Sequence, residues 1–529
     1  MRSGVFGQLT ALRMARENRP VLAALVLAFA FLVWKARYLV YPDLAFTYPF
    51  ITFDGFQWIL DADLYAGKDV SAAYRNPGLP LVIALLGKLG ATRYLPLLTT
   101  ALLGVFFVYL TLLLIGEKYR PWTVSLVVLL LFFNYTVQTT FDFVLADQWA
   151  LTLQLLAIYH LRRSKEDLRH VFLFVLWAAI SFHFQYAIAW LTPAFLYYWF
   201  VEVRPAARLR SAADRAGLAA LALGLLLVAP PFVYKWKQFG NPLFSHVTQF
   251  PLVRLHFFGT PYYAVNLLAY FGVPAALTAA YGFFKSAGKR GFPGFMNLCF
   301  LCWAGFWVFL YSWLDSRFIL YALPFVAFAL AEGLERIDVP SLVSFRTQAL
   351  PRVLLGCALV PLALLYSLYE RGSPFAAHRL PVSPQNVLVF GVVPITNWEA
   401  NVTIDVANWK LENVTDRIPA WTFLRRYYPE HRRAVPPAAI EELEELRRLR
   451  AAAERELGGN YRVARCGSLP DDYYSRMRRE IVLDRRLREC GEAAEARLYA
   501  SADPMAGESV IFAGRTYRLA RADRDARAR

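Results

Sequence analysis

Charged side chains that could perform chemistry lie at the ends of apolar segments in this sequence. Asp54 follows the first long apolar run, and Arg75 lies near the end of the polar stretch 53–80 that separates this run from the next. The apolar runs themselves are almost free of charge. Further ionisable residues in similar positions are Asp142, Asp147, His183, Lys235, His246, Asp315 and Arg317. Hydropathy predicts that all of them lie on one face of a membrane.

This set of residues fits one kind of reaction. A carboxylate can accept the proton of an attacking hydroxyl group, and cations stabilise the charge that develops on a phosphate leaving group. Arg matches a phosphate with its planar fork, whereas Lys acts as a point charge. A sugar carried on a polyprenyl phosphate, whose tail stays in the bilayer, is a substrate of this type. The residues therefore predict transfer from an anionic amphiphile.

The composition is that of a membrane protein. Of 529 residues, 57% are hydrophobic, and the mean hydropathy is +0.36. The apolar residues come in runs of about 20, the length that crosses a bilayer. The net charge of +17 would suit nucleic acid, but much of the basic excess flanks apolar runs, where it orients helices. We therefore expect a lipid bilayer and no nucleic acid as partner, and a soluble enzyme is excluded.

The hydropathy pattern predicts a polytopic α-helical protein of about eleven spans. Basic residues precede the first run, 21–33, and no small-residue cleavage site follows it, so we interpret this run as an uncleaved span that starts in the cytoplasm. The first outer loop is then 41–92, with short helices in the membrane interface. The spans between 121 and 201 determine the side of the tail, because one span more or fewer would move it to the cytoplasm.

The composition changes near residue 371. We predict a transmembrane domain at 1–370, a small mixed α/β soluble domain at 371–520 outside the cytoplasm, and a disordered basic tail at 521–529. Residues 438–457 have the charge pattern of an amphipathic helix. Two cysteines of this region, at 466 and 490, could form a disulfide in an oxidising compartment.

Four short motifs occur in a fixed order along residues 15–370. The first is an Asp directly after the first span, followed by an Ala-x-x-Tyr segment. The second is R-x-P-G-x-P before an apolar run, the third is an Asp at the start of a span, and the fourth is an Arg at the start of the segment SRFILYALPFVAFALAEGLE. Their residues are Asp54 with Ala62–Tyr65, Arg75 with Pro77, Gly78 and Pro80, Asp147, and Arg317.

These motifs resemble those of the GT-C membrane glycosyltransferases, in particular the branch of the protein O-mannosyltransferases and aminoarabinose transferases (glycosyltransferase family 39). Two positions differ from the family pattern, because Leu79 replaces an aromatic residue and Ala146 replaces a proline. The soluble domain matches no family pattern. The resemblance implies a GT-C-like fold and an inverting transfer from a polyprenyl-phosphate-linked sugar to a glycan, lipid or protein acceptor. The active site would lie on the outer face of a bacterial or archaeal plasma membrane.

The resemblance also implies roles for individual residues. Asp54 would be the catalytic base, and Asp147 would shape the second outer loop and orient the acceptor. Arg75 and Arg317 would bind the donor phosphate. We add His183, Lys235 and His246 as candidate substrate-binding residues. Some plainer interpretations stay open: the first Asp could cap a surface helix, the first Arg could reach lipid headgroups, and the two His could be structural.

Asp61 and Asp63 form a DxD motif, which holds a divalent metal in other glycosyltransferases. Positions i and i+2 point to different sides of a helix. We therefore interpret this pair as a solvated face and expect no cofactor and no metal site, although a single DxD leaves a metal requirement open.

Two other functions stay open from the sequence. A flippase or transporter of lipid-linked saccharide would need polar residues in the middle of its spans. A non-catalytic membrane assembly partner would leave the acidic and basic residues of the outer loops scattered over separate surfaces. Convergence of these residues on one cavity would favour the enzyme.

Overall fold

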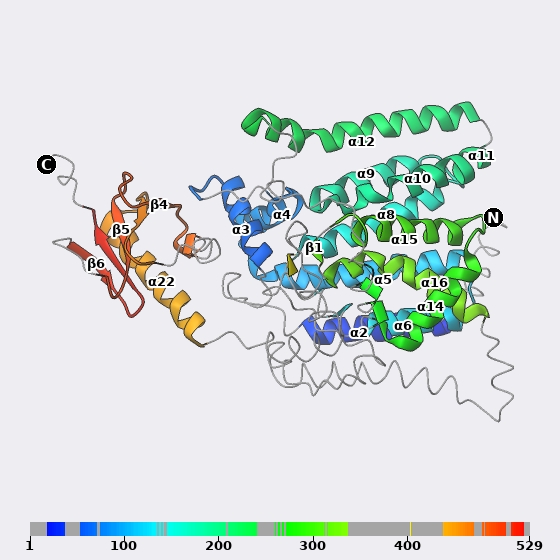
Figure 1. Cartoon of the computed structure of the whole chain (residues 1–529), viewed down its shortest axis with the longest axis horizontal. Helices are drawn as coiled ribbons and strands as arrows, with labels where there is room; N and C mark the ends of the chain where they lie inside the picture. The colour runs from blue at the N-terminus through cyan, green and yellow to red at the C-terminus, as the bar shows by residue number, and fades with distance from the viewer. Residues whose placement is uncertain are drawn as a thin grey trace, which may run out of the picture.

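The structure is a computed structural model, and the fold described below rests on part of the chain. The described residues are 18–36, 53–70, 75–134, 137–138, 141, 145–207, 210–240, 260, 263–264, 267–268, 271–311, 313–314, 316–336, 402–403, 437–469, 479–480, 482–503 and 509–522. The last apolar run, at about 351–369, which we predict to be the eleventh span, lies outside this part, as do three of the predicted outer residues, Asp142, His246 and Asp315. Figure 1 shows a bundle of helices at the amino-terminal side and a smaller group of strands with one helix at the carboxyl-terminal side.

Apolar helices form the bundle. By length and composition, four described helical segments could cross a membrane, and they are Arg19–Ala36, Leu95–Gly116, Arg210–Lys237 and Phe318–Arg336. The helices of the bundle are α2 (Arg19–Ala36), α5 (Leu95–Gly116), α6 (Pro121–Phe132), α8 (Ala146–Arg163), α9 (His170–Phe184), α10 (Thr192–Tyr198), α11 (Arg204–Ala206), α12 (Arg210–Phe239), α14 (Val273–Ser286), α15 (Phe292–Trp307) and α16 (Leu323–Arg336). Helical segments thus lie at the positions of the first ten predicted spans, and the count of eleven spans stays a prediction.

Two of these helices occupy contrasting places. In the apolar stretch that α16 forms with the turn before it, 94% of the residues are buried, so this helix lies at the centre of the bundle. In the apolar stretch of α12 only 6% of the residues are buried, and Leu218, Leu221 and Leu225 are exposed. An apolar helix that exposes its side chains to this extent needs lipid around it. The long helix α12 therefore forms a lipid-facing edge of the bundle (Figure 1).

Helices α14 and α16 approach each other through two glycines. A Cβ atom at Gly282 would lie 1.9 Å from the carbonyl oxygen of Ala329, and one at Gly333 would lie 2.2 Å from the carbonyl oxygen of Thr278. Small residues at such crossings allow the backbones of membrane helices to pack closely. The absence of side chains at these two positions is therefore a condition for the central place of α16.

Short helices of the first outer loop cover one end of the bundle. They are α3 (Phe53–Tyr65), α4 (Gly78–Lys88) and the 3₁₀ turn η2 (Thr92–Tyr94). The opposite end is held by ion pairs between helix ends, such as Arg162 with Glu117 at 2.7 Å and Arg120 with Glu335 at 2.8 Å. The connection between α9 and α10 is the 3₁₀ segment η3 (Tyr186–Leu191), and a 3₁₀ segment, η6 (Ser316–Ala322), precedes α16.

The carboxyl-terminal elements form a five-stranded sheet with one packed helix. The strands are β3 (Val463–Arg465), β4 (Leu487–Glu489), β5 (Ala496–Ala500), β6 (Ser509–Ala513) and β7 (Tyr517–Arg521), and the helix is α22 (Pro437–Leu457). The spatial order is β4-β3-β5-β7-β6, with parallel pairing around β3 and antiparallel pairing around β7. Leu446, Leu449 and Ala453 of α22 face the sheet at helical spacing. A disulfide joins Cys466 to Cys490. A separate two-stranded sheet pairs β1 (Trp313–Leu314) with β2 (Val402–Thr403).

The glycine contact between α14 and α16 generates a stability prediction. Gly282→Ala should destabilise the protein by about 2 kcal/mol, because the new methyl group must displace the backbone of α16. Gly305→Ala is the matched control in α15, since nothing lies within 4 Å of the position that its Cβ atom would take, and it should be neutral or stabilising by about 0.5–1 kcal/mol. Thermal unfolding in detergent, followed by Trp fluorescence, measures both. Equal stability of the two variants would disprove the close contact.

Candidate functional site

Helix α3 holds Arg75 through one of its faces. The carboxylate of Asp61 accepts a hydrogen bond from the backbone N–H of Arg75 at 2.6 Å, and Gln57 accepts one from the guanidinium Nε. The guanidinium carbon lies 5.7 Å from the ring centroid of Trp58, within the range of a cation–π contact. Positions 57, 58 and 61 share one side of a helix because they are three and four residues apart. The polar loop is therefore folded back onto α3 at the Arg of its R-x-P-G motif.

Asp61 is buried, and our interpretation of it as part of a solvated face is wrong. Its exposed fraction is 2%, whereas Asp63 lies on another side of α3 and pairs with Lys68 at 2.9 Å. The two carboxylates thus diverge, as the DxD spacing predicts. No group of three or more His, Cys, Asp or Glu side chains that could hold a metal ion occurs among the described residues.

Lys235, near the carboxyl end of α12, is a buried cation. Its exposed fraction is 5%, and its Nζ atom has no hydrogen-bond partner within the described part of the chain. Asp61 is the carboxylate whose charge acts on it. A buried ammonium group without hydrogen bonds is unfavourable by several kcal/mol unless an anion compensates it. The surroundings of Lys235 therefore favour a negatively charged ligand.

His183 replaces a hydrogen-bond donor that a proline removes from α12. Pro231 has no N–H group, so the carbonyl oxygen of Leu227 loses its partner in the helix. The Nε2 atom of His183 lies 2.9 Å from this oxygen and is placed to donate a hydrogen bond to it. The proline also loosens the helix just before the turn that carries Lys235. His183 thus has a structural role, and its predicted contact with substrate stays a prediction.

Asp147 connects α8 to the segment before α16. It lies in the first turn of α8 with an exposed fraction of 1%, where the helix dipole stabilises a negative charge. Its Oδ1 atom accepts a hydrogen bond from the hydroxyl of Tyr321 at 2.7 Å. Tyr321 belongs to η6, the element that also contains Arg317. Asp147 therefore fixes the position of η6.

A stack of two aromatic rings connects the first turn of α8 to the end of α9. The ring of Trp149 stacks on Phe184 at 5.3 Å with an angle of 1°, and the Nδ2 atom of Asn76 donates to the carbonyl oxygen of Phe184 at 3.4 Å. A Cβ atom at Gly78 would lie 2.7 Å from the ring of Phe184. This close approach explains the glycine of the R-x-P-G motif. It places the segment after Arg75 against the end of α9, whose Phe184 ring stacks in turn on Trp149 in the first turn of α8.

The structure brings together some of the predicted residues. Asp61 holds the backbone of Arg75 and acts electrostatically on Lys235, His183 contacts α12, the helix of Lys235, and Asp147 contacts η6, the element of Arg317. Position 54 is in the first turn of α3, and position 317 is in η6. The side chains of these last two residues, and the whole of His246, lie outside the described part of the chain. Sequence reasoning missed Gln57 and Tyr321 and misjudged Asp61, although the spacing 54, 57, 61 along one helix face was a usable signal.

No protein-family model and no curated protein sequence matches this chain. Its fold resembles the crystal structure of ArnT from Cupriavidus metallidurans in the apo state, with a TM-score of 0.54 and 12% identity over 94% of this chain and 97% of that one. ArnT from the same organism bound to undecaprenyl phosphate gives a TM-score of 0.53 and 13% identity over 95% and 97%. The chain has an ArnT-like fold. The expected resemblance to the GT-C membrane glycosyltransferases and a polytopic helical membrane protein are thereby confirmed at the level of fold.

The hydrogen bond between His183 and Leu227 generates a second prediction. His183→Ala should destabilise the protein by about 1 kcal/mol, because it leaves a buried carbonyl group unpaired. Pro231→Ala restores an N–H donor within α12, so His183→Ala should have a much smaller effect in that background. The four proteins of this double-mutant cycle are compared by thermal unfolding in detergent. Additive effects would show that the histidine does not serve the carbonyl freed by the proline.

Proposed function

We propose that this protein transfers a sugar from a polyprenyl-phosphate donor to an acceptor at the outer face of the membrane. The observation that carries this proposal is the buried Lys235, whose ammonium has the charge of Asp61 in its surroundings but no hydrogen-bond partner among the described residues. The oxygens of a phosphate would supply the hydrogen-bond acceptors that this ammonium lacks. The ArnT-like fold supports the same ligand class, because an ArnT of this fold has been crystallised with undecaprenyl phosphate.

The donor phosphate would bind between α3 and the end of α12. Arg75 offers its planar guanidinium, and Lys235 offers a point charge on the opposite element. Arg317 on η6 would complete the set. The exposed leucines of α12 leave a path in the bilayer along which the polyprenyl tail can reach Lys235. In a buried site these cations act more strongly on the leaving phosphate than they would in water.

Asp54 would act as the base. Position 54 is seven residues before position 61, and such positions share a face of an α-helix. The carboxylate would take the proton of an acceptor hydroxyl group as its oxygen attacks the anomeric carbon. The bond between this carbon and the phosphate oxygen breaks in the same step, and polyprenyl phosphate leaves with the bonding electron pair. One displacement of this kind inverts the configuration at the sugar.

A flippase for lipid-linked saccharide is the second candidate, and polar residues of α8 favour it. Gln148, Thr152 and Gln154 are buried within the bundle, and the Thr152 hydroxyl and the Gln154 amide nitrogen have no hydrogen-bond partner within the described part of the chain. These groups could line a polar path. They are uncharged, however, whereas the buried ionised residues that carry the proposal, Asp61 and Lys235, are in α3 and near the carboxyl end of α12. Transfer is therefore the better-supported function.

The proposed base predicts a loss of transfer without a loss of fold. Asp54→Asn should lower the rate by about 10²- to 10⁴-fold, because the amide cannot accept the proton. The measurement is the release of polyprenyl phosphate from polyprenyl-phosphate hexose donors by membranes that contain the variant. Asp214→Asn, at the other end of α12 in an exposed ion pair with Arg204, is the control and should transfer normally. A fully active Asp54→Asn protein would rule out this base, and saccharide translocation by the same variant would favour the flippase.

The proposed phosphate contact predicts a specific kinetic defect. Lys235→Met should lower kcat/KM for the donor by about tenfold or more, since a charged hydrogen bond to the phosphate is lost. The KM for the acceptor should not change. Lys237→Met is the matched control, because Lys237 is exposed in the same helical turn. If the two variants behave alike, Lys235 does not contact the donor.

A further inference from the structure

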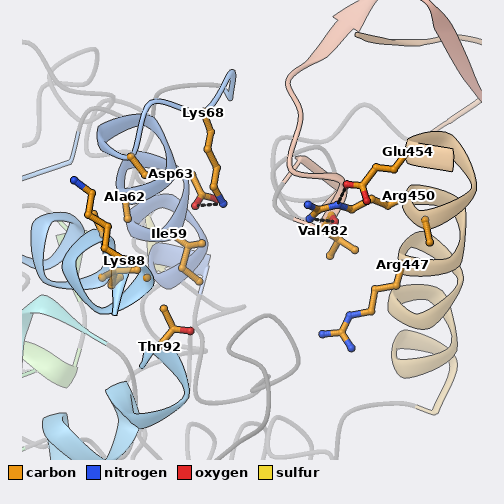
Figure 2. Close-up of a pocket in the computed structure, with 15 residues that line it drawn as sticks. Ile59, Ala62, Asp63, Lys68, Lys88, Thr92, Arg447, Arg450, Glu454 and Val482 are labelled. Carbon is orange, nitrogen blue, oxygen red and sulfur yellow. Dashed lines mark hydrogen bonds and ion pairs between the residues drawn. The ribbon is translucent and has the colours of Figure 1, made fainter. Parts of the chain in front are cut away.

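The two faces of helix α3 have different surroundings. Ile59, Ala62 and Asp63 are on the face that lines a cleft of about 700 Å³ toward the carboxyl-terminal helix α22 (Figure 2). Positions 54, 61 and 65 recur at intervals of seven and four residues, so they share the opposite face of the helix. This second face carries Asp61 and ends at Tyr65, the last residue of α3. Tyr65 therefore extends the candidate site and does not belong to the cleft.

Two further tyrosines from other elements lie in the neighbourhood of Tyr65. Tyr186 is the first residue of η3, and Tyr234 precedes Lys235 in α12. Asp61, Tyr234 and Tyr186 are the groups that act electrostatically on the hydroxyl of Tyr65, and such interactions decline with distance. The three tyrosines thus come from three elements that meet beside Asp61.

The hydroxyl groups of these tyrosines are available to a ligand. Within the described part of the chain, none of the three hydroxyls makes a hydrogen bond. Loss of hydration raises the pKa of Tyr65 to about 12, with a smaller contribution from the charge of Asp61. The Tyr65 hydroxyl therefore keeps its proton at neutral pH, and it can donate as well as accept a hydrogen bond.

The ring of Tyr186 is held in place by two other aromatic rings. Its centroid lies 4.6 Å from that of Phe182 and 6.1 Å from that of Phe232, with an angle of 23° to the latter ring. These distances are typical of stabilising aromatic pairs. Phe232 is three residues before Lys235 in α12, so the two side chains lie on the same side of this helix. The aromatic cluster of Phe182, Tyr186 and Phe232 therefore adjoins the turn that carries the buried ammonium group.

Rings combined with free hydroxyl groups fit a sugar. A sugar ring has C–H groups on its faces and hydroxyl groups around its edge, and a tyrosine side chain has an apolar ring and a polar tip. A polyprenyl tail could contact the rings but has no group that pairs with the hydroxyls. Tyrosines at a membrane surface also meet lipid headgroups, but those residues are exposed, whereas Tyr186 is half-buried against two rings.

We propose that Tyr65, Tyr186 and Tyr234 form the subsite that binds the sugar of the lipid-linked donor. This inference rests on the proposed function, which puts the donor phosphate at Lys235. The sugar is bonded directly to that phosphate, so it lies beside Lys235 and against the aromatic cluster. The ring of Tyr186 supports one face of the sugar, and the tyrosine hydroxyls exchange hydrogen bonds with the hydroxyl groups at its edge. The substrate class is a polyprenyl-phosphate hexose with free hydroxyl groups.

A comparison of two lipids tests this subsite. The full-length protein in detergent is titrated with polyprenyl-phosphate glucose and with polyprenyl phosphate of the same chain length, and bound lipid is counted by native mass spectrometry. We expect the glucose lipid to bind more tightly. Tyr186→Phe and Tyr65→Phe keep the rings, and each should weaken binding of the glucose lipid by about threefold to tenfold, the effect of one neutral hydrogen bond. Neither should change the binding of polyprenyl phosphate.

Tyr197→Phe is the matched control, because Tyr197 in α10 is exposed by 41% and Tyr65 by 42%, and it should bind both lipids as the unaltered protein does. Three results would overturn the subsite: equal affinity of the unaltered protein for the two lipids, an equal change for both lipids in the Tyr65 and Tyr186 variants, or no change in either variant. Lys235→Met should weaken the binding of both lipids, because they share the phosphate. Failure of the phosphate contact and failure of the sugar contact are thus observed separately.

Discussion

The arrangement of the candidate site depends on one electrostatic constraint, the burial of opposite charges on two elements that are far apart in the sequence. Asp61 on α3 and Lys235 on α12 are both almost completely buried. An isolated buried charge is unfavourable by several kcal/mol, and a nearby opposite charge offsets this. Separation of α12 from α3 would therefore deprive Lys235, which has no hydrogen bond within the described part of the chain, of the nearby opposite charge of Asp61. Because Asp61 also holds the backbone of Arg75, the same constraint fixes the polar loop.

Two features of the backbone, a hydrogen bond lost at a proline and a close approach at a glycine, determine how the helices around these charges pack. Pro231 removes a donor from α12, and His183 supplies one from α9, so the two helices are joined at Leu227. Gly78 allows the segment after Arg75 to lie on the ring of Phe184. Both contacts involve the carboxyl end of α9, which thus connects α12 to the start of α4. The charged groups are thus carried by rigid elements, which a preorganised site requires.

The sequence predicts those features of the fold that depend on residues close together in the chain, and it does not predict those that depend on residues far apart in the chain. Apolar runs and their basic flanks are local signals, so helices occur where hydropathy predicts them. The divergence of Asp61 and Asp63 is also local, because it follows from helix geometry. The burial of Asp61 is not local: it depends on Arg75 and Lys235, which only the tertiary fold brings near it. The role of His183 likewise depends on a proline in another helix, and no pattern around His183 reveals it.

Within the described part of the chain, the carboxyl-terminal domain does not contact the residues of the candidate site directly; it contacts the turn that follows α3, the helix that carries Asp61. Lys68 pairs with Asp484, and the carbonyl oxygen of Asp69 accepts a hydrogen bond from the backbone N–H of Arg486 at 2.6 Å. Ion pairs with partly exposed partners contribute about 0–1 kcal/mol each, so these contacts alone hold the domain weakly. Since α3 carries Asp54 and Asp61, these contacts connect the carboxyl-terminal sheet to the helix that carries the candidate site.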